Sequence, residues 1–342
     1  MRRFLTLREG SIVVVTVVAA LYFSLKVDHF FSHANFVTLL PYFAPFAILA
    51  VGEVMLMVAG EIDLSIGSVY LFAPFMFYEF NQAGLPLGVD FILALLVSAV
   101  VGVVNGVVTD YFGVSSFITT LGMLLGLGGL TLIISHAAPV EMPGANVTSV
   151  VVNVKHNVNG HIITLAEHKN HFSTFASIFG AGAYSEFIWA LVIVAVVHVI
   201  LTMTRWGMYT VAVGGNKLGA AEAGVKVRAI VIRNFVLCSV FAGIVGILEA
   251  VRSGSVTPDT AGASETMFRA VSAAVIGGTL LAGGQGTAIG ALIGALFLGV
   301  LRDGLTLQGV SADYLDFILG LAIIIAMIIN VYVGRVRKGS GV

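Results

Sequence analysis

Residues 270–301 read AVSAAVIGGTLLAGGQGTAIGALIGALFLGVL and contain no charged side chain. Because a membrane-spanning helix needs only about 20 predominantly apolar residues, this segment is longer than one span requires. Its middle holds Ala282-Gly283-Gly284-Gln285-Gly286, a glycine cluster that favours a turn over a helix. The segment therefore predicts two short membrane spans with a break between them.

The composition of the whole chain is also that of a membrane protein. Its 342 residues are 58% hydrophobic and 10% charged, whereas about 25% of the residues in soluble domains are charged. A net charge of -1 provides no basic surface for a phosphate backbone, which excludes nucleic acid as a partner. The single cysteine, Cys238, excludes an internal disulfide. We therefore predict one polytopic membrane domain over residues 1–342 and a lipid bilayer around it.

Apolar runs along the chain predict about ten spans, so the predicted fold class is an all-α polytopic membrane protein. The third span follows a polar break at residues 60–63, and the third, eighth and ninth spans are predicted to be short. Interrupted spans commonly line substrate paths, because irregular backbone at membrane depth survives only against protein or water. The predicted spans are centred near residues 18, 48, 72, 100, 124, 195, 240, 274, 295 and 323.

The distribution of lysine and arginine predicts the orientation. With ten spans both chain ends lie on one side, together with the loop 205–228, and cytoplasmic segments are enriched in basic residues. The opposite side then receives the loops 26–34, 79–90, 136–185, 252–265 and 302–313. Of the 17 basic residues, 11 lie on the side predicted to be cytoplasmic: Arg2, Arg3, Arg8, Arg205, Lys217, Lys226, Arg228, Arg233, Arg335, Arg337 and Lys338.

Two loops are long enough to carry a function. In the external loop 136–185, residues Asn146 to Ala166 alternate in the manner of strands around Asn159-Gly160, which predicts a small β-hairpin followed by a polar helix or loop. In the internal loop 205–228, a short helix is predicted around residues 217–223, with Gly224 ending it. Five histidines of the external loop have spacings that could hold a metal, although a solvated polar loop is the simpler interpretation: His136, His156, His161, His168 and His171.

Three Gly-x-x-x-Gly pairs lie inside apolar spans. They are Gly102/Gly106, Gly122/Gly126 and Gly290/Gly294. Such pairs let two helix backbones approach closely, and small residues also permit helices to slide. The pattern predicts tight helix packing and leaves open whether any of these contacts moves.

Sequence patterns of enzymes are missing from the chain. It has no Gly-x-x-x-x-Gly-Lys-Ser/Thr phosphate loop, no His-Glu-x-x-His metal site and no Gly-x-Ser-x-Gly nucleophile motif. We therefore expect no catalytic residues, no bound metal and no cofactor. If nucleotide energy is used, another chain must bind the nucleotide.

Acidic side chains at membrane depth are rare and commonly functional. Glu53 lies inside the second span, where it either hydrogen-bonds across helices or faces a conduit. Asp63 precedes an apolar helix, so it either caps that helix or lines the path. Glu249 has Arg252 three residues further on and is expected to pair with it.

Three motifs carry a family resemblance. The segments Glu61-Ile62-Asp63-Leu64-Ser65-Ile66-Gly67-Ser68, Ala212 to Val225, and Ala273 to Gly286 resemble, in order and spacing, signatures of permease subunits in bacterial ABC importers of the ribose/xylose/galactose type. The resemblance covers residues 35–135 and 186–334. Four residues depart from the family pattern: Glu61 replaces a usual glycine, Glu53 replaces an uncharged residue, and Arg302-Asp303 replaces an Asn-rich pair.

The resemblance implies a permease of the bacterial inner (cytoplasmic) membrane with three kinds of protein partner. These are an ABC ATPase, a periplasmic or lipid-anchored solute-binding protein and a second permease, identical or paralogous. The implied solute is a monosaccharide or similar small polar molecule. The residues expected to couple to the ATPase are Gly214, Gly215, Asn216, Ala220, Ala221 and Gly224, and those expected to line or gate the path are Glu53, Asp63, Ser65, Ser68, Gly283 and Gly284.

One alternative function class remains open from the sequence. A stand-alone secondary transporter or channel would use Glu53 or Asp63 as a proton or cation site, as intramembrane carboxylates often do. The identity of the solute is also open, since a path suited to a pentose or hexose would also pass a nucleoside or a polyol.

Overall fold

The structure is a computed structural model. It describes the backbone of residues 10–145, 148–158, 161–171, 173–182, 184–311, 314–315, 317–325 and 327–328, and the side chains of these residues outside 148–171. The helices in chain order are α2 (Gly10–Lys26), α3 (His33–Val58), α4 (Ile66–Gln82), α5 (Leu87–Asp110), α6 (Ser116–Ile134), α7 (Thr174–Ile178), α8 (Ser185–Met203), α9 (Arg205–Gly215), α10 (Lys217–Glu222), α11 (Val227–Ser253), α12 (Thr260–Ile276) and α13 (Ala288–Leu307). The strands are β1 (Val140–Glu141), β2 (Thr148–Val158), β3 (His161–His171) and β4 (Ser255–Val256).

Every predicted span centre lies in helical structure. Nine of the centres fall in α2, α3, α4, α5, α6, α8, α11, α12 and α13, and residue 323 lies among the helical residues described between 314 and 328. Six of these helices (α3, α5, α6, α8, α11 and α13) are long and apolar enough to cross a membrane. The all-α polytopic class is therefore confirmed, while the count of ten spans remains a prediction.

Both predicted breaks are present. Residues 59–65 separate α3 from α4, and residues 277–287 separate α12 from α13. In the second break Gly278, Gly283 and Gly284 have φ values of 95°, 87° and 76°, a left-handed conformation that glycine adopts without the steric cost of a Cβ.

The prediction that the ninth span is short was wrong. α13 has 20 residues and continues through Arg302 and Asp303 to Leu307, into the predicted loop 302–313. Its two charges are accommodated by contacts from other helices, since Asn35 Nδ2 donates to Asp303 Oδ2 at 2.9 Å and Arg302 stacks over the Tyr42 ring. α12 likewise begins at Thr260, inside the predicted loop 252–265, because Asp259 caps it.

α3 lies at the centre of the bundle and packs against α8, α11, α12 and α13.

The Gly-x-x-x-Gly pairs differ in what they contact. A Cβ added to Gly102 would lie 2.6 Å from the backbone of Phe235 in α11, so α5 and α11 meet at their backbones, whereas an added Cβ at Gly122 or Gly126 of α6 would meet nothing within 4 Å. Tight packing is therefore confirmed for α5, and the α6 face is open.

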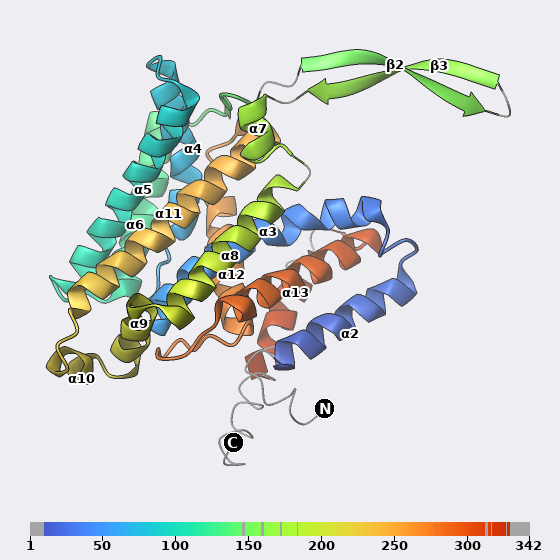
Figure 1. Cartoon of the computed structure of the whole chain (residues 1–342). Coiled ribbons are helices and arrows are strands. Elements are labelled where there is room, and N and C mark those ends of the chain that lie inside the picture. The colour runs from blue at the N-terminus through green and yellow to red at the C-terminus, as the bar shows by residue number, and fades with distance from the viewer. Residues whose placement is uncertain are drawn as a thin grey trace.

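The internal loop contains more helix than predicted. α10 forms where the helix 217–223 was predicted, and Gly224 follows its C-cap with a φ of 85°. α9 was not predicted, and it begins where the Thr204 hydroxyl accepts a hydrogen bond from Gly207 N. Figure 1 shows α9 and α10 at one end of the bundle, with α7 and the β2–β3 strands at the other.

The loop that follows α6 contains three strands, β1, β2 and β3, which take part in two strand pairs. β1 pairs with β4, joining this loop to the connection between α11 and α12. β2 and β3 pair antiparallel from Thr148 opposite His171 to Val158 opposite His161, in the region where a hairpin was predicted. The predicted turn residues Asn159 and Gly160 lie outside the described residues, as do the side chains of His156, His161, His168 and His171.

Candidate functional site

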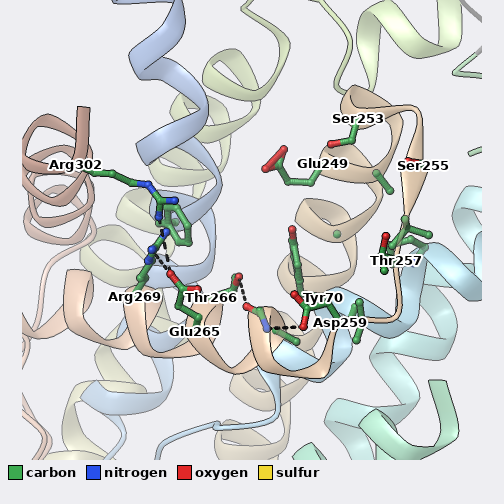
Figure 2. Close-up of a pocket in the computed structure, with 18 residues that line it drawn as sticks. Tyr70, Glu249, Ser253, Ser255, Thr257, Asp259, Glu265, Thr266, Arg269 and Arg302 are labelled. Carbon is green, nitrogen blue, oxygen red and sulfur yellow. Dashed lines mark hydrogen bonds and ion pairs between the residues drawn. The ribbon is translucent and has the colours of Figure 1, made fainter. Parts of the chain in front are cut away.

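A cavity of about 350 Å³ lies between α4, α11, α12 and the connection from α11 to α12 (Figure 2). Because it adjoins the last turn of α11 and the β1–β4 pair, it belongs to the α7 end of the bundle, away from α10. Its polar lining comes from five parts of the chain: Tyr70 (α4), Glu249 and Ser253 (α11), Ser255, Thr257 and Asp259 (β4 and the loop after it), Glu265, Thr266 and Arg269 (α12) and Arg302 (α13).

One wall of this cavity carries two arginines and one glutamate, which lie together in Figure 2. Glu265 forms an ion pair with Arg269, and Arg302 Nη1 lies 3.9 Å from Glu265 Oε1. The guanidinium of Arg269 lies 5.7 Å from the centre of the Phe46 ring, a distance suited to a cation–π contact. Two guanidinium groups share one carboxylate here, so this wall is cationic.

The opposite wall is acidic and rich in hydroxyl groups. Arg252 binds Glu249 through two hydrogen bonds, Nε to Oε2 at 2.6 Å and Nη2 to Oε1 at 2.8 Å, which confirms the predicted pair. Arg252 Nε also lies 3.2 Å from Oε1 of Glu186, so two carboxylates share this one guanidinium. Asp259 Oδ1 accepts hydrogen bonds from the first backbone N–H groups of α12. The cavity thus presents acceptors on one side and donors on the other.

A second cavity, of about 530 Å³, adjoins the first. Both cavities are lined by Phe46, Glu265, Arg269 and Arg302, so this charged group stands between them. The rest of the second lining is mostly apolar and includes Tyr42, Phe268, Leu298, Leu319 and Ile323. Sites for small molecules commonly combine apolar and aromatic walls with a few fixed polar groups, as these two cavities do together.

The predicted path residues Glu53, Asp63 and Ser65 lie elsewhere, in a fully buried polar cluster at the break between α3 and α4. Asp63 Oδ1 accepts from Ser65 N at 2.8 Å and from the Ser65 hydroxyl at 2.6 Å, while Asn105 Nδ2 donates to Ser65 Oγ at 2.8 Å. Glu53 Oε2 accepts a longer bond, 3.5 Å, from Asp63 N. Ser65, and not Asp63, is therefore the N-cap residue of α4, and Asp63 contacts the helix only through Ser65. Neither carboxylate lines the two cavities above.

Ser68 borders a different hollow. It is one of the residues around a cavity of about 320 Å³ between α4, α6 and α12, and its hydroxyl donates to Leu124 O at 2.6 Å. Its role in a path remains a prediction.

The structure brings two separately predicted groups of glycines into contact. A Cβ added to Gly214, at the end of α9, would lie 1.8 Å from Val58 O and 2.7 Å from Gly284 N. Gly284 N in turn donates to Val58 O at 2.8 Å. The end of α3, the end of α9 and the break between α12 and α13 thus meet backbone to backbone, and we call this contact of Val58, Gly214 and Gly284 the glycine joint.

The remaining predicted coupling residues form α10 and its ends. Asn216 Oδ1 caps α10 by accepting from Gly219 N at 2.9 Å. Ala220 is buried against the bundle, whereas Ala221 is exposed and Gly215 has open space beside it. α10 therefore presents one packed face and one free face.

Lys217 ties α10 to the bundle, although it was not among the predicted coupling residues. Lys217 Nζ lies 3.2 Å from Glu61 Oε1 and 3.0 Å from Asp110 Oδ1. Burial opposes the charge on Lys217, but the hydrogen bond to Asp110 and the charges of Glu61 and Asp110 outweigh it and raise the pKa of Lys217. Lys217 therefore stays charged at neutral pH. Lys217 and Glu61 are 156 positions apart in the sequence, so no local pattern predicts this pair.

Comparison with known proteins identifies the family. The sequence profile described as "Branched-chain amino acid transport system / permease component" matches residues 35–327, most of the chain. The chain belongs to this permease family. The permease is 31% identical over 341 residues to the xylose/arabinose import permease protein XylH of Sulfolobus acidocaldarius, covering 98% of this chain and 86% of that one.

Other relatives of the permease are also named as sugar transport permeases. It is 31% identical over 334 residues to the ribose import permease protein RbsC of Escherichia coli, covering 96% of each chain, and 26% identical over 324 residues to the D-allose transport system permease protein AlsC of the same species, covering 94% and 91%. No solved structure matches the permease. The resemblance to ABC importer permeases is thereby confirmed, and the permease is a transmembrane transport component and not an enzyme.

Metal binding has no support among the described residues, where no group of three or more His, Cys, Asp or Glu side chains could hold an ion. Of the five histidines considered, only His136 has a described side chain.

Proposed function

We propose that this permease admits a monosaccharide or a similar neutral polyhydroxylated solute, driven by a separate ABC ATPase. The observation that carries the proposal is that α12 and α13 connect the polar cavity of about 350 Å³ to the glycine joint. Both helices line the polar cavity through Glu265, Arg269 and Arg302, and the break between them holds the glycine joint with α9. A displacement of α9 and α10 would therefore reach the cavity through two helices.

The walls of the cavity suit a solute with many hydroxyl groups. Each hydroxyl both donates and accepts, so it can bond to carboxylates and to guanidinium groups. Glu249 and Glu265 are each paired with an arginine, and Asp259 accepts hydrogen bonds from backbone N–H groups, which favours a neutral solute over a strongly charged one. A volume of about 350 Å³ lies within the range of small-molecule sites. The names of the relatives, which refer to ribose, xylose, arabinose and allose, agree with this class.

The proposal assigns the two ends of the bundle to the two sides of the inner membrane. The α9–α10 end is placed in the cytoplasm, because Arg205, Lys217, Lys226, Arg228 and Arg233 lie in or next to it. The cavity and the loop 136–185 then face a solute-binding protein outside the membrane. In this arrangement ten spans cross the membrane, and both termini are cytoplasmic. A second permease copy would complete the path, and the open glycine face of α6 offers one surface for it.

The free face of α10 is proposed to dock to the ATPase. Ala221→Asp places an unpaired charge on that face, and a charge without a partner is costly in an interface. We expect this variant to lose most of its co-purifying ATPase while its own yield and melting temperature stay near wild type, because Ala221 is exposed.

The matched control for this test is Ala83→Asp, which adds the same charge at the exposed C-cap of α4, at the other end of the bundle. Affinity purification of the tagged permease with its co-expressed ATPase measures the effect. Equal retention of the ATPase by the Ala221 and Ala83 variants would remove α10 as the docking site.

A further inference from the structure

The half-exposed side chain of Lys217 joins α10 to two other elements. Its ammonium contacts Glu61, in the break between α3 and α4, and Asp110, the last residue of α5. The exposed fractions of the side chains are 49% for Lys217, 13% for Glu61 and 6% for Asp110. The two carboxylates are thus largely withdrawn from water and depend on this cation.

A second cation reaches the same group from the start of α11. Arg228 Nε lies 3.6 Å from Asp110 Oδ2, and its guanidinium lies 5.3 Å from the centre of the Tyr111 ring. Asp110 therefore accepts one cation from α10 and one from α11. The segment that connects α10 to α11 is therefore held to the end of α5 on both sides, by Lys217 before it and Arg228 after it.

Glu61 connects this group to the cavity. It lies five residues before the start of α4, in a break that Asp63 and Ser65 hold in a fixed shape. α4 then lines the cavity with Tyr70, Leu71 and Pro74. A movement of Lys217 would shift Glu61 and, through the rigid break, the helix that bears Tyr70.

We propose that Lys217 is a positioning residue for transport, and that its ion pairs with Glu61 and Asp110 transmit the displacement of α10 to α4 and α5. This inference rests on the proposed function, since it requires an ATPase that moves α10. The displacement of α10 would then reach the cavity by two routes. The ion pairs of Lys217 act on α4 and α5, and the glycine joint acts on α12 and α13.

Charge reversal followed by rescue tests the inference. Lys217→Glu places a third carboxylate against Glu61 and Asp110, which repel it. In proteoliposomes that contain the ATPase and the binding protein, we expect solute transported per ATP hydrolysed to fall about tenfold, within the 5–150-fold range of common coupling effects. The double variant Glu61→Lys/Lys217→Glu keeps the charge composition of the group and is expected to recover most of the wild-type ratio.

Two further variants keep the test decisive. Lys226→Glu makes the same charge change in the same loop at an exposed residue that forms no ion pair with the described part of the chain, and it should leave the ratio within about twofold of wild type, well below a coupling effect. Glu61→Gln removes one pair without adding repulsion and should lower the ratio in the same direction, which decides the matter if Lys217→Glu does not fold.

The inference would be overturned by a wild-type ratio in both Lys217→Glu and Glu61→Gln, by an equal loss in Lys226→Glu, or by a double variant as defective as Lys217→Glu. Failure of the wild-type protein to transport with ATP would instead overturn the proposed function.

Discussion

Gly214→Ala is expected to lower transport to less than about a tenth of the wild-type rate, while Gly215→Ala in the next position is expected to leave it close to wild type. The methyl group at residue 214 would lie 1.8 Å from Val58 O and 2.7 Å from Gly284 N, distances at which the backbones must separate. Overpacking of this kind costs about 1–3 kcal/mol or more, and here it acts on the contact between α9 and the break of α12 and α13. The same methyl group at residue 215 meets nothing within 4 Å.

Uptake of labelled solute into proteoliposomes measures this difference, with the amount of ATPase bound to each variant as the companion measurement. Gly214→Ala should retain its ATPase, because the α10 surface is unchanged, but should transport at less than about a tenth of the wild-type rate, a loss of roughly 1.4 kcal/mol in coupling. Transport at the wild-type rate by a folded Gly214→Ala protein would show that the glycine joint does not transmit motion.

The second large effect is expected at Arg302. Its guanidinium borders both cavities, and Arg302→Leu removes a charged donor from the wall that the solute is proposed to touch. Hydrogen bonds to charged groups contribute about 1.5–3 kcal/mol, so the maximal uptake rate should fall about tenfold or more. The solute concentration for half-maximal uptake should change little, because the binding protein, and not this cavity, captures the free solute.

Arg233→Leu is the matched control, since Arg233 is an exposed arginine of α11 outside both cavities. Its maximal rate should stay near wild type. If Arg302→Leu and Arg233→Leu transported equally well, the cavity between α4, α11 and α12 would not be part of the solute path.

The local features of the fold were predictable from the sequence because they depend on neighbouring residues. The apolar runs predicted the helices, and the glycines at 283–286 and the polar residues at 60–63 predicted the two breaks. The end of α13 was misjudged because the charges Arg302 and Asp303 resemble a loop in sequence. Contacts with Tyr42 and Asn35, more than 250 residues away, make a helix possible there.

The candidate site could be predicted only in part, because its residues come together from distant segments. Gly102/Gly106 and Gly122/Gly126 have the same spacing, yet only the first pair meets another backbone. From the sequence, Gly214 was predicted to couple to the ATPase and Gly284 to line or gate the path. Their contact with each other appears only in the fold. Arg269, Glu265 and Lys217 were missed because ordinary charged residues carry no motif until a partner lies beside them.

The two carboxylates considered for a secondary transporter are both fully buried at the break between α3 and α4. Asp63 accepts a hydrogen bond from Ser65 N, at the residue before α4, and Glu53 accepts one from Asp63 N in the same buried cluster. Neither lines the cavity that carries the proposed function. An ATP-driven mechanism therefore agrees better with the arrangement than an ion-driven one.

The decisive test of ATP-driven import is uptake of a labelled pentose or hexose into proteoliposomes. The permease would be reconstituted with its ATPase and its solute-binding protein, and uptake compared with ATP inside, with a proton or sodium gradient alone, and without the binding protein. We expect uptake only when ATP, the ATPase and the binding protein are all present. Uptake driven by an ion gradient without the ATPase would contradict this expectation.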